Sequence, residues 1–258
     1  MKKINIQTAE SSSFFDEQEN KNTIIRNCDC KVLIQEMKEK HIKVDAIITD
    51  PPYCVSRDHQ LGFSNMGRSG MNYGKWDYGF DHKQWIVDSA DLIVAGGAFI
   101  IFTDWKNSSY IVEALEQKGF LVKDLIRWEK TNPMPRNVDS RYVMDFEVAI
   151  WAVKAGKKWT FNKPKEVPYL KPVYRSGVVL GKNRIHPTQK NLEVVINLIK
   201  VHTNKDDLIF DPFFGSATTA IACRQTERKF IGSEIDEAYY NKAKERLNGL
   251  FTTELHGQ

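Results

Sequence analysis

The sequence lacks several features that mark common classes of protein. No apolar run approaches the roughly twenty residues that a membrane-spanning helix needs, and the polar residues 1–7 contain no hydrophobic signal segment. Only four cysteines occur in 258 residues, and their spacing matches neither a zinc site nor a disulfide framework. We therefore expect a cytoplasmic protein with free thiols, no membrane partner and no bound metal.

Two nucleotide-binding motifs are missing as well. The chain contains neither the Gly-Lys-Ser/Thr that a Walker loop requires nor a complete Gly-x-Gly-x-x-Gly. The second absence disfavours a nucleotide-dependent oxidoreductase on an α/β fold.

The patterns that are present indicate one α/β domain. Hydrophobic residues make up 41% of the chain, which is enough for a sizeable core. Short apolar runs alternate with segments of helical spacing, and this alternation predicts a doubly wound, mostly parallel sheet. Expected strands cover residues 23–27, 44–49, 98–102, 121–128, 146–153, 208–210 and 229–234. Expected helices lie near residues 32–37, 85–94 (ended by Gly96 and Gly97), 111–119, 192–199, 217–224 and 239–247. The polar residues 1–22 are expected to form a flexible arm before a single domain over residues 23–258.

A stiff turn follows the apolar strand at residues 44–49. It consists of a carboxylate, two prolines and an aromatic ring, Asp50-Pro51-Pro52-Tyr53. Proline cannot continue a central strand, and the residue before it is restricted to an extended backbone. Open α/β sheets bind their ligands at the carboxyl ends of the strands. The turn is therefore a candidate site, although a lone motif of this kind also fits an ordinary strand-terminating turn.

A second candidate lies at residues 211–219, where a strand leads into a helix. Such a turn directs backbone N–H groups and the positive end of a helix at an anion. Gly215 allows close approach of a ligand, and Ser216 and Thr218 supply hydroxyl donors. Glu234 ends the next strand, where an acid commonly binds ribose hydroxyls. Because the loop has no lysine or arginine, the pattern predicts an adenosine-containing ligand with a carboxylate rather than a triphosphate. The alternative is an ordinary strand–helix turn.

Positive charge is concentrated in residues 154–184, which carry nine basic residues and one acid. This segment sums to +8, whereas the rest of the chain sums to −4. The imbalance predicts a polyanionic partner, with lysines on phosphates and with aromatic rings and Asn162 either on bases or in packing. A solvated basic loop is the alternative. The Gly-, Ser- and Asn-rich residues 56–80 contain a second set of candidate nucleic-acid contacts. The candidate contacts in the two segments are Arg57, Arg68, Lys75, Lys157, Lys158, Lys163, Lys165, Lys171 and Arg175.

In chain order, these motifs resemble S-adenosylmethionine-dependent DNA methyltransferases that act on exocyclic amines. The tetrapeptide at Asp50 is similar to their catalytic motif, and residues 211–215 are similar to their cofactor loop. The catalytic motif comes first, as in the permuted (beta) class, which places target recognition between the two. Residues 27–30, residues 128–135 with Arg141 and Glu147, and residues 186–190 resemble further blocks, so the resemblance spans roughly residues 23–247. It implies the Rossmann-like class I methyltransferase fold.

The resemblance also implies roles for individual residues. Catalysis falls to Asp50, Pro51, Pro52 and Tyr53. S-adenosylmethionine is expected to contact Asp29, His186, Thr188, Gln189, Lys190, Asp211, Phe213, Gly215, Ser216, Thr218 and Glu234. Residues 154–184 are expected to recognise the DNA target. The chain departs from the family at Ala217, where a second glycine is common, and at Asn191, where proline is common.

The implied mechanism is geometric and electrostatic. Asp50 and the Pro51 carbonyl would accept the two N–H hydrogens of the target amine and turn its lone pair toward the sulfonium methyl group. Tyr53 would stack on a base flipped out of the duplex. Aspartate at the first motif position resembles the adenine-N6 enzymes, so we expect a site-specific DNA adenine-N6 methyltransferase.

Three alternatives stay open from the sequence. The first two alternatives change the target, to cytosine N4 in DNA or to adenine N6 in RNA. The third is a non-catalytic DNA-binding module. The intact tetrapeptide and Glu234 argue against the module. A homodimer and an association in function with a restriction endonuclease are both open, because no pattern in the chain bears on them.

Overall fold

The structure is a computed structural model. It describes residues 22–53, 80–81, 83–135, 138–140, 142–180, 184–186 and 188–254, with side chains up to residue 249. The expected flexible arm, apart from Asn22, lies outside these residues. So do three of the candidate nucleic-acid contacts, Arg57, Arg68 and Lys75.

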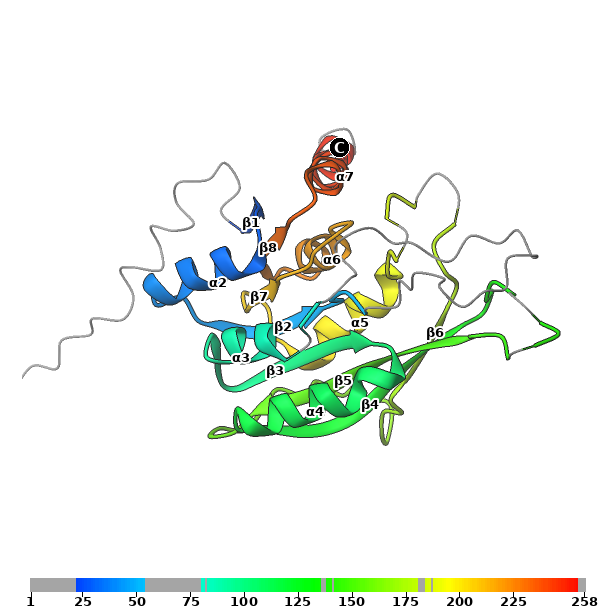
Figure 1. Cartoon of the computed structure of the whole chain (residues 1–258), viewed down its shortest axis with the longest axis horizontal. Coiled ribbons are helices and arrows are strands. Elements are labelled where there is room, and N and C mark those ends of the chain that lie inside the picture. Colours follow the sequence, from blue (N-terminus) through cyan, green and yellow to red (C-terminus); the bar gives the residue numbers. More distant parts are fainter. Residues whose placement is uncertain are drawn as a thin grey trace, which may run out of the picture.

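Eight strands of the described chain form one sheet in the order β1-β8-β7-β2-β3-β5-β4-β6 (Figure 1). The strands are β1 (Thr23–Asn27), β2 (Val44–Thr49), β3 (Ile93–Thr103), β4 (Phe120–Lys130), β5 (Phe146–Lys154), β6 (Val173–Ser176), β7 (Leu208–Asp211) and β8 (Lys229–Glu234). Strand β5 runs antiparallel to both of its neighbours, and the other adjacent pairs are parallel. The predicted mostly parallel α/β sheet is confirmed.

Helices cover both faces of the sheet. One face packs against α2 (Cys30–Glu39), α3 (Gln84–Ala90) and α4 (Ser108–Gln117). The other packs against α5 (Leu192–His202), α6 (Thr218–Gln225) and α7 (Glu237–Glu254). A 3-10 turn, η2 (Trp105–Asn107), precedes α4. Because successive strand residues point to opposite faces, Ile47 joins the first core and Ile48 the second. The continuous apolar run at residues 46–48 therefore reflects a strand that is buried on both sides.

The expected helix at residues 85–94 is wrong in its second half. Helix α3 ends at Ala90, and Gly96 and Gly97 lie inside β3 rather than at a helix stop. The pairing of β2 with β3 shifts between residues 44 and 46, which marks a bulge in β3. Gly96 takes a φ of +83°, and a Cβ at Gly97 would lie 2.7 Å from the Asp45 carbonyl. The two glycines therefore permit a bulge.

The fold brings the two candidate motifs together. Strands β2 and β7 are hydrogen-bonded neighbours, and each is followed in sequence by a strand on its own outer side, β3 and β8 respectively. A doubly wound sheet opens a crevice at such a switch point, outside the carboxyl ends of the strands. Asp50 follows β2 and Asp211 ends β7, so both aspartates face this crevice. None of the helices in the described ranges has the length and apolar character to cross a bilayer.

Candidate active site

A cavity of about 790 Å³ lies at the carboxyl ends of β2 and β7. Its wall includes all four residues of the predicted catalytic tetrapeptide. It also includes every residue that was predicted to contact the cofactor: Asp29, His186, Thr188, Gln189, Lys190, Asp211, Phe213, Gly215, Ser216, Thr218 and Glu234. The structure thus brings residues from both ends of the chain into one pocket.

Both carboxylate oxygens of Asp50 have hydrogen-bond partners. The Tyr53 hydroxyl donates to Oδ1 at 2.5 Å, and the Lys190 ammonium donates to Oδ2 at 2.5 Å. Lys190 Nζ also lies 3.3 Å from the Tyr53 hydroxyl oxygen. The backbone of the turn is held as well, because the Asn107 side-chain amide donates to the Tyr53 carbonyl at 3.0 Å. The carboxylate is therefore fixed from two sides.

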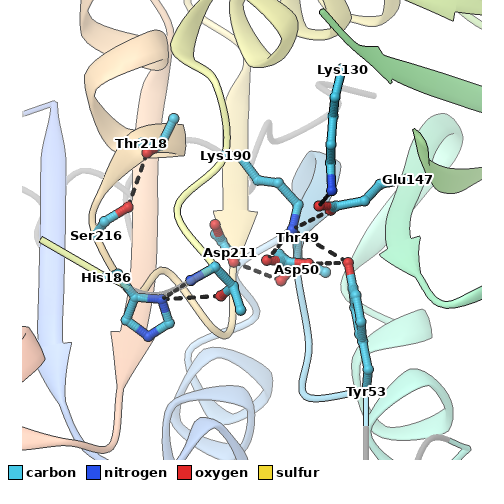
Figure 2. A network of polar contacts seen from close by, with 11 residues as sticks. Thr49, Asp50, Tyr53, Lys130, Glu147, His186, Lys190, Asp211, Ser216 and Thr218 are labelled. Carbon is cyan, nitrogen blue, oxygen red and sulfur yellow. Dashed lines mark hydrogen bonds and ion pairs between the residues drawn. The ribbon is translucent and has the colours of Figure 1, made fainter. Parts of the chain in front are cut away.

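The contact with Lys190 extends into a network of four charged side chains. Lys190 Nζ lies 3.0 Å from Glu147 Oε2, and Glu147 Oε1 accepts from Lys130 Nζ at 2.8 Å. Figure 2 shows the Lys190 ammonium between Asp50 and Glu147, with Lys130 on the far side of Glu147. The side chain of Lys190 is only 7% exposed. Two carboxylates and two ammonium groups thus balance each other at the edge of the pocket.

Burial and these ion pairs act in opposite directions on the titrating groups. Burial raises the pKa of Asp50, while the neighbouring Lys190 ammonium opposes that rise. Burial also raises the pKa of Glu147, but Lys190 and Lys130 outweigh it and bring the pKa below its ordinary value. Burial would lower the pKa of Lys190, yet Asp50 and Glu147 together raise it. Burial is the main cause and the negative charge of Asp50 the second cause that raise the pKa of Tyr53 well above its ordinary value. The Tyr53 hydroxyl therefore stays a donor at neutral pH.

A short hydrogen bond links the two motifs. The Thr49 hydroxyl donates to Asp211 Oδ1 at 2.6 Å, and both side chains are almost fully buried. The same oxygen accepts the Phe213 backbone N–H at 3.1 Å. Burial raises the pKa of Asp211 to about 6 in spite of these donors. Asp211 therefore fixes the backbone of the loop at Phe213, and its hydrogen bond with Thr49 connects the loop to β2, the strand that Asp50 follows.

Aromatic rings form one wall of the pocket. Phe213 packs edge-on against Trp85, with ring centroids 5.2 Å apart, and against Phe80 at 5.4 Å. Phe80, Trp85 and Phe213 all line the cavity. This wall is apolar and aromatic, and ring contacts of this kind can hold a purine ring.

The loop between β7 and α6 takes unusual backbone conformations. Gly215 has a φ of +49°, and a Cβ there would lie 3.8 Å from the His186 ring. Ala217 also has a left-handed backbone, with a φ of +60°, which costs a residue other than glycine about 1–2 kcal/mol. The family's common second glycine at this position thus has a conformational reason. His186 packs edge-on against Tyr239, and burial lowers its pKa to about 4, so it is neutral at physiological pH.

The two predicted cofactor acids both have structural contacts. Glu234 accepts backbone N–H groups from Gly215 at 3.1 Å and from Asp236 at 2.8 Å. Asp29 caps α2 by accepting the Lys31 N–H at 2.9 Å. Because each ionised carboxylate has about four lone-pair sites, both acids keep capacity for hydroxyl or amine donors of a ligand.

The candidate DNA contacts do not gather at this pocket. Because β5 is antiparallel, its end at Lys154 lies at the opposite edge of the sheet from Asp50. Lys157 and Lys158 follow it and lie against Gly96 in the β3 bulge. Lys165 and Lys171 are exposed and do not line the cavity.

Two further residues of the basic segment make contacts within the protein. The Lys163 ammonium donates to the carbonyls of Pro164 and Val167. Asn162 is exposed, but its amide donates to the carbonyls of Lys200 and Thr203 at the end of α5, so its hydrogen bonds are made within the fold.

The segment returns to the pocket only after β6. Arg175 pairs with Glu129 at 2.7 Å beside the end of β4. The Val178 N–H then donates to the Asn132 side chain at 2.7 Å, which fixes the segment to the β4–β5 connection. The lining of the cavity includes Val178, Val179, Leu180 and Arg184.

Several site residues had no predicted role. Lys130 and Glu147 belong to sequence blocks that were compared with the family, but neither was connected to Asp50. Their signal was a lysine at the end of one apolar strand and an acid at the start of the next. Thr49 was treated only as the end of a strand. Within the described ranges, no three His, Cys, Asp or Glu side chains are arranged to hold a metal ion.

Known proteins match most of the chain. A family model described as DNA methylase, N6_N4_Mtase, matches residues 44–245. The chain is 32% identical over 250 residues to the type II methyltransferase M2.LlaDCHI of Lactococcus lactis subsp. cremoris, which covers 89% of this chain and 91% of that one. It is also 32% identical over 252 residues to the type II methyltransferase M2.MboI of Moraxella bovis, over 91% and 90% of the two chains.

Solved structures agree with these relatives. The M1.HpyAVI–SAM complex is 41% identical and superposes with a TM-score of 0.73, over 88% of this chain and 99% of that chain. The cytosine-N4-specific PvuII DNA methyltransferase has a TM-score of 0.65 at 16% identity, over 92% and 94%, and shows the fold alone. The predicted class I methyltransferase fold is therefore confirmed, and the chain belongs to the N6_N4 family of DNA methylases and is an S-adenosylmethionine-dependent DNA methyltransferase.

Proposed function

We propose that this enzyme methylates the N6 amine of adenine in DNA, with Asp50 as the residue that shapes the amine. The observation that carries the proposal is the position of the Asp50 carboxylate. It lies in the same pocket as the loop after β7, and the Thr49–Asp211 hydrogen bond links the two. A nitrogen held by Asp50 and a methyl donor held by the loop would meet in that pocket.

The residues around the pocket fit S-adenosylmethionine. The volume of about 790 Å³ is in the range of small-molecule sites. Phe213 and its aromatic neighbours offer a surface for adenine, while Glu234 and Asp29 offer acceptors for ribose hydroxyls and the adenine amine. The N-terminus of α6 presents its positive end and the Ser216 and Thr218 hydroxyls to the methionine carboxylate. When bound, S-adenosylmethionine supplies an electrophilic methyl group on its sulfonium sulfur.

The catalytic role of the tetrapeptide follows from its fixed geometry. Asp50 and the Pro51 carbonyl accept the two amine hydrogens, which localises the nitrogen lone pair and stabilises the positive charge that develops on it. Pro51 and Pro52 keep the turn rigid, and Tyr53 presents its ring to the flipped base. A carboxylate at position 50 stabilises this charge, and aspartate at this position resembles the adenine-N6 enzymes, which favours adenine N6 over cytosine N4 as the target.

The proposal extends to where DNA binds, and the position of the pocket supports it. A flipped base enters at the carboxyl edge of the sheet, so the duplex must lie over that edge. In residues 154–184, the part from β6 onward returns to this edge, where Arg175 in β6 pairs with Glu129 and Arg184 lines the cavity. We therefore assign target recognition to that part of the predicted segment within one methyltransferase domain of residues 23–258. Lys157, Lys158 and Lys163 contribute long-range attraction to the phosphate backbone at most.

The decisive variant is Asp50→Ala. We expect it to lose methyl transfer from labelled S-adenosylmethionine to DNA, while calorimetry still detects cofactor binding within severalfold of the unaltered enzyme. Asp91→Ala, at an exposed aspartate before β3, is the matched control and should keep its activity. Retained transfer by the Asp50 variant would refute the role of Asp50. Absent cofactor binding by the unaltered protein would instead favour a DNA-binding module.

The proposal includes the setting of the enzyme. Its relatives in L. lactis and M. bovis are named type II methyltransferases, which supports a place beside a restriction endonuclease and an action on DNA in the bacterial cytoplasm. Protection of the host's DNA from a co-expressed endonuclease of the same specificity would test this. The proposal also includes a homodimer. Light scattering should then give twice the chain mass of 29.8 kDa, and a single chain mass would refute it.

A further inference from the structure

Lys190 is a buried cation beside the catalytic carboxylate, and it has no role in the reaction steps proposed above. Its ammonium lies 2.5 Å from Asp50 and 3.0 Å from Glu147. The rings of Tyr53 and Phe102 lie beside it, with centroids 5.5 and 5.2 Å from Nζ. Removing a lysine ammonium from water is unfavourable, so such a group is stable in a pocket wall only with well-placed partners.

We propose that Lys190 is a positioning residue that fixes the orientation and charge of the Asp50 carboxylate, and that Glu147 in turn holds Lys190 in place. The inference rests on the proposed function, in which the target amine donates to Asp50. It adds two residues that touch neither the base nor the methyl group but determine the state of the group that does.

The backbone around Lys190 is suited to this task. Asn191, the next residue, caps α5 by accepting the Glu193 N–H at 2.9 Å, and its amide donates to the Gly177 carbonyl at 2.9 Å. Gln189, the preceding residue, accepts the Ile185 N–H at 2.9 Å. Both neighbours are thus anchored, and the Lys190 side chain extends from a fixed point to Asp50.

The partners of Asp50 act on it from all sides. Tyr53 comes from its own turn, Lys190 from the segment before α5, Glu147 from β5 and Asp211 from β7. Lys130 acts through Glu147, and Asp104 acts on Tyr53. In this set Lys190 is the cation that touches Asp50 directly. Without Lys190, the burial of Asp50 and the nearby carboxylates of Glu147 and Asp211 would all favour the protonated form of Asp50.

This arrangement predicts opposite effects for two variants. Lys190→Met removes the opposing charge, so Asp50 should hold its proton to a higher pH. The acid limb of kcat/KM should move up by roughly 1–3 pH units, the usual effect of an opposite charge at this range. Glu147→Gln removes a like charge, so the acid limb should move down. A role in packing alone would lower activity equally at all pH values and move neither limb.

The experiment is a set of pH profiles of kcat/KM for methyl transfer to DNA. It compares the unaltered enzyme with Lys190→Met, Lys190→Arg and Glu147→Gln. Lys190→Arg keeps the charge and should return the acid limb to within half a pH unit of the original. Lys205→Met is the matched control, because Lys205 forms an exposed pair with Glu227, and its profile should not change.

The outcomes separate this inference from the function on which it rests. Upward and downward shifts in the two variants, with rescue by arginine, support it. Unshifted acid limbs in Lys190→Met and Glu147→Gln overturn it, provided that Asp50→Ala is inactive and the proposed function therefore holds. Should Lys190→Met fail to fold or to bind S-adenosylmethionine in calorimetry, the downward shift in Glu147→Gln alone decides. Full activity of Asp50→Ala overturns the proposed function itself.

Discussion

The hydrogen bond between Thr49 and Asp211 allows a quantitative test of how the two motifs are coupled. Thr49→Val keeps the shape of the side chain and removes the donor that lies 2.6 Å from Asp211 Oδ1. The two side chains are 2% and 3% exposed, so water does not readily replace the lost hydroxyl. Asp211 would then have to be ionised with one donor fewer or take up a proton.

The size of the effect should depend on pH. Burial raises the folded-state pKa of Asp211 from its ordinary 3.8 to about 6. The folded protein therefore binds the proton more tightly than the unfolded chain, and this group's stabilising contribution falls as pH rises through 6. The Thr49 donor favours the charged form, so its removal raises the pKa further. A hydrogen bond to a charged group contributes about 1.5–3 kcal/mol and one to a neutral group about 0.5–1.5 kcal/mol. We expect a loss of about 1 kcal/mol at pH 5 and about 2–3 kcal/mol at pH 8.5.

Urea unfolding at the two pH values measures this difference. Thr226→Val is the matched control, because the buried Thr226 hydroxyl donates to a neutral carbonyl, that of Ala222, at 2.7 Å. It should cost about 1 kcal/mol at both pH values. The Thr49 variant should also bind S-adenosylmethionine more weakly, since Asp211 accepts the Phe213 N–H and so fixes the cofactor loop. An equal loss of stability for Thr49→Val at pH 5 and pH 8.5 would refute the reasoning.

Three further predictions concern other parts of the fold. His202 is 4% exposed, and burial lowers its pKa to about 4. The free energy of unfolding should therefore fall by about 1.4 kcal/mol per pH unit from pH 6.5 down to 4. Urea titrations should show that His202→Asn loses this slope, and an unchanged slope would contradict the prediction. Asn162→Ala should cost about 1–2 kcal/mol of stability, because it removes the hydrogen bonds to the carbonyls at the end of α5. Its DNA affinity in fluorescence anisotropy should be unchanged, and weaker DNA binding at full stability would count against this structural role. Glu234→Gln should weaken S-adenosylmethionine binding at least tenfold in calorimetry, and an unchanged dissociation constant would remove Glu234 from the cofactor site.

Much of this architecture could be predicted because it depends on local patterns. Apolar runs such as residues 46–48 are buried on both faces, and they stand out from helical spacing. The mechanism implied by the family resemblance placed the motifs at Asp50 and Asp211 in one site, and they meet because the carboxyl ends of parallel strands share one edge of the sheet. The cavity includes every predicted catalytic and cofactor residue for this reason.

The rest depends on strand directions and long-range pairing that no local pattern records. Residues 154–184 look like one basic unit in sequence. Because β5 is antiparallel, however, the segment begins at the far edge of the sheet and reaches the pocket only after β6. The Gly96–Gly97 bulge was mistaken for a helix stop because glycine serves both purposes. The Lys190–Glu147–Lys130 network joins three segments whose charges have no partner in the local sequence.

The central claim is that Asp50 presents an adenine amine to S-adenosylmethionine. Its most direct test is to methylate genomic DNA with labelled cofactor, digest the product to nucleosides and identify the labelled base by mass spectrometry. The account predicts label in N6-methyladenine with the unaltered enzyme and none with Asp50→Ala. Label in N4-methylcytosine, or label in N6-methyladenine that persists in the Asp50 variant, would contradict it.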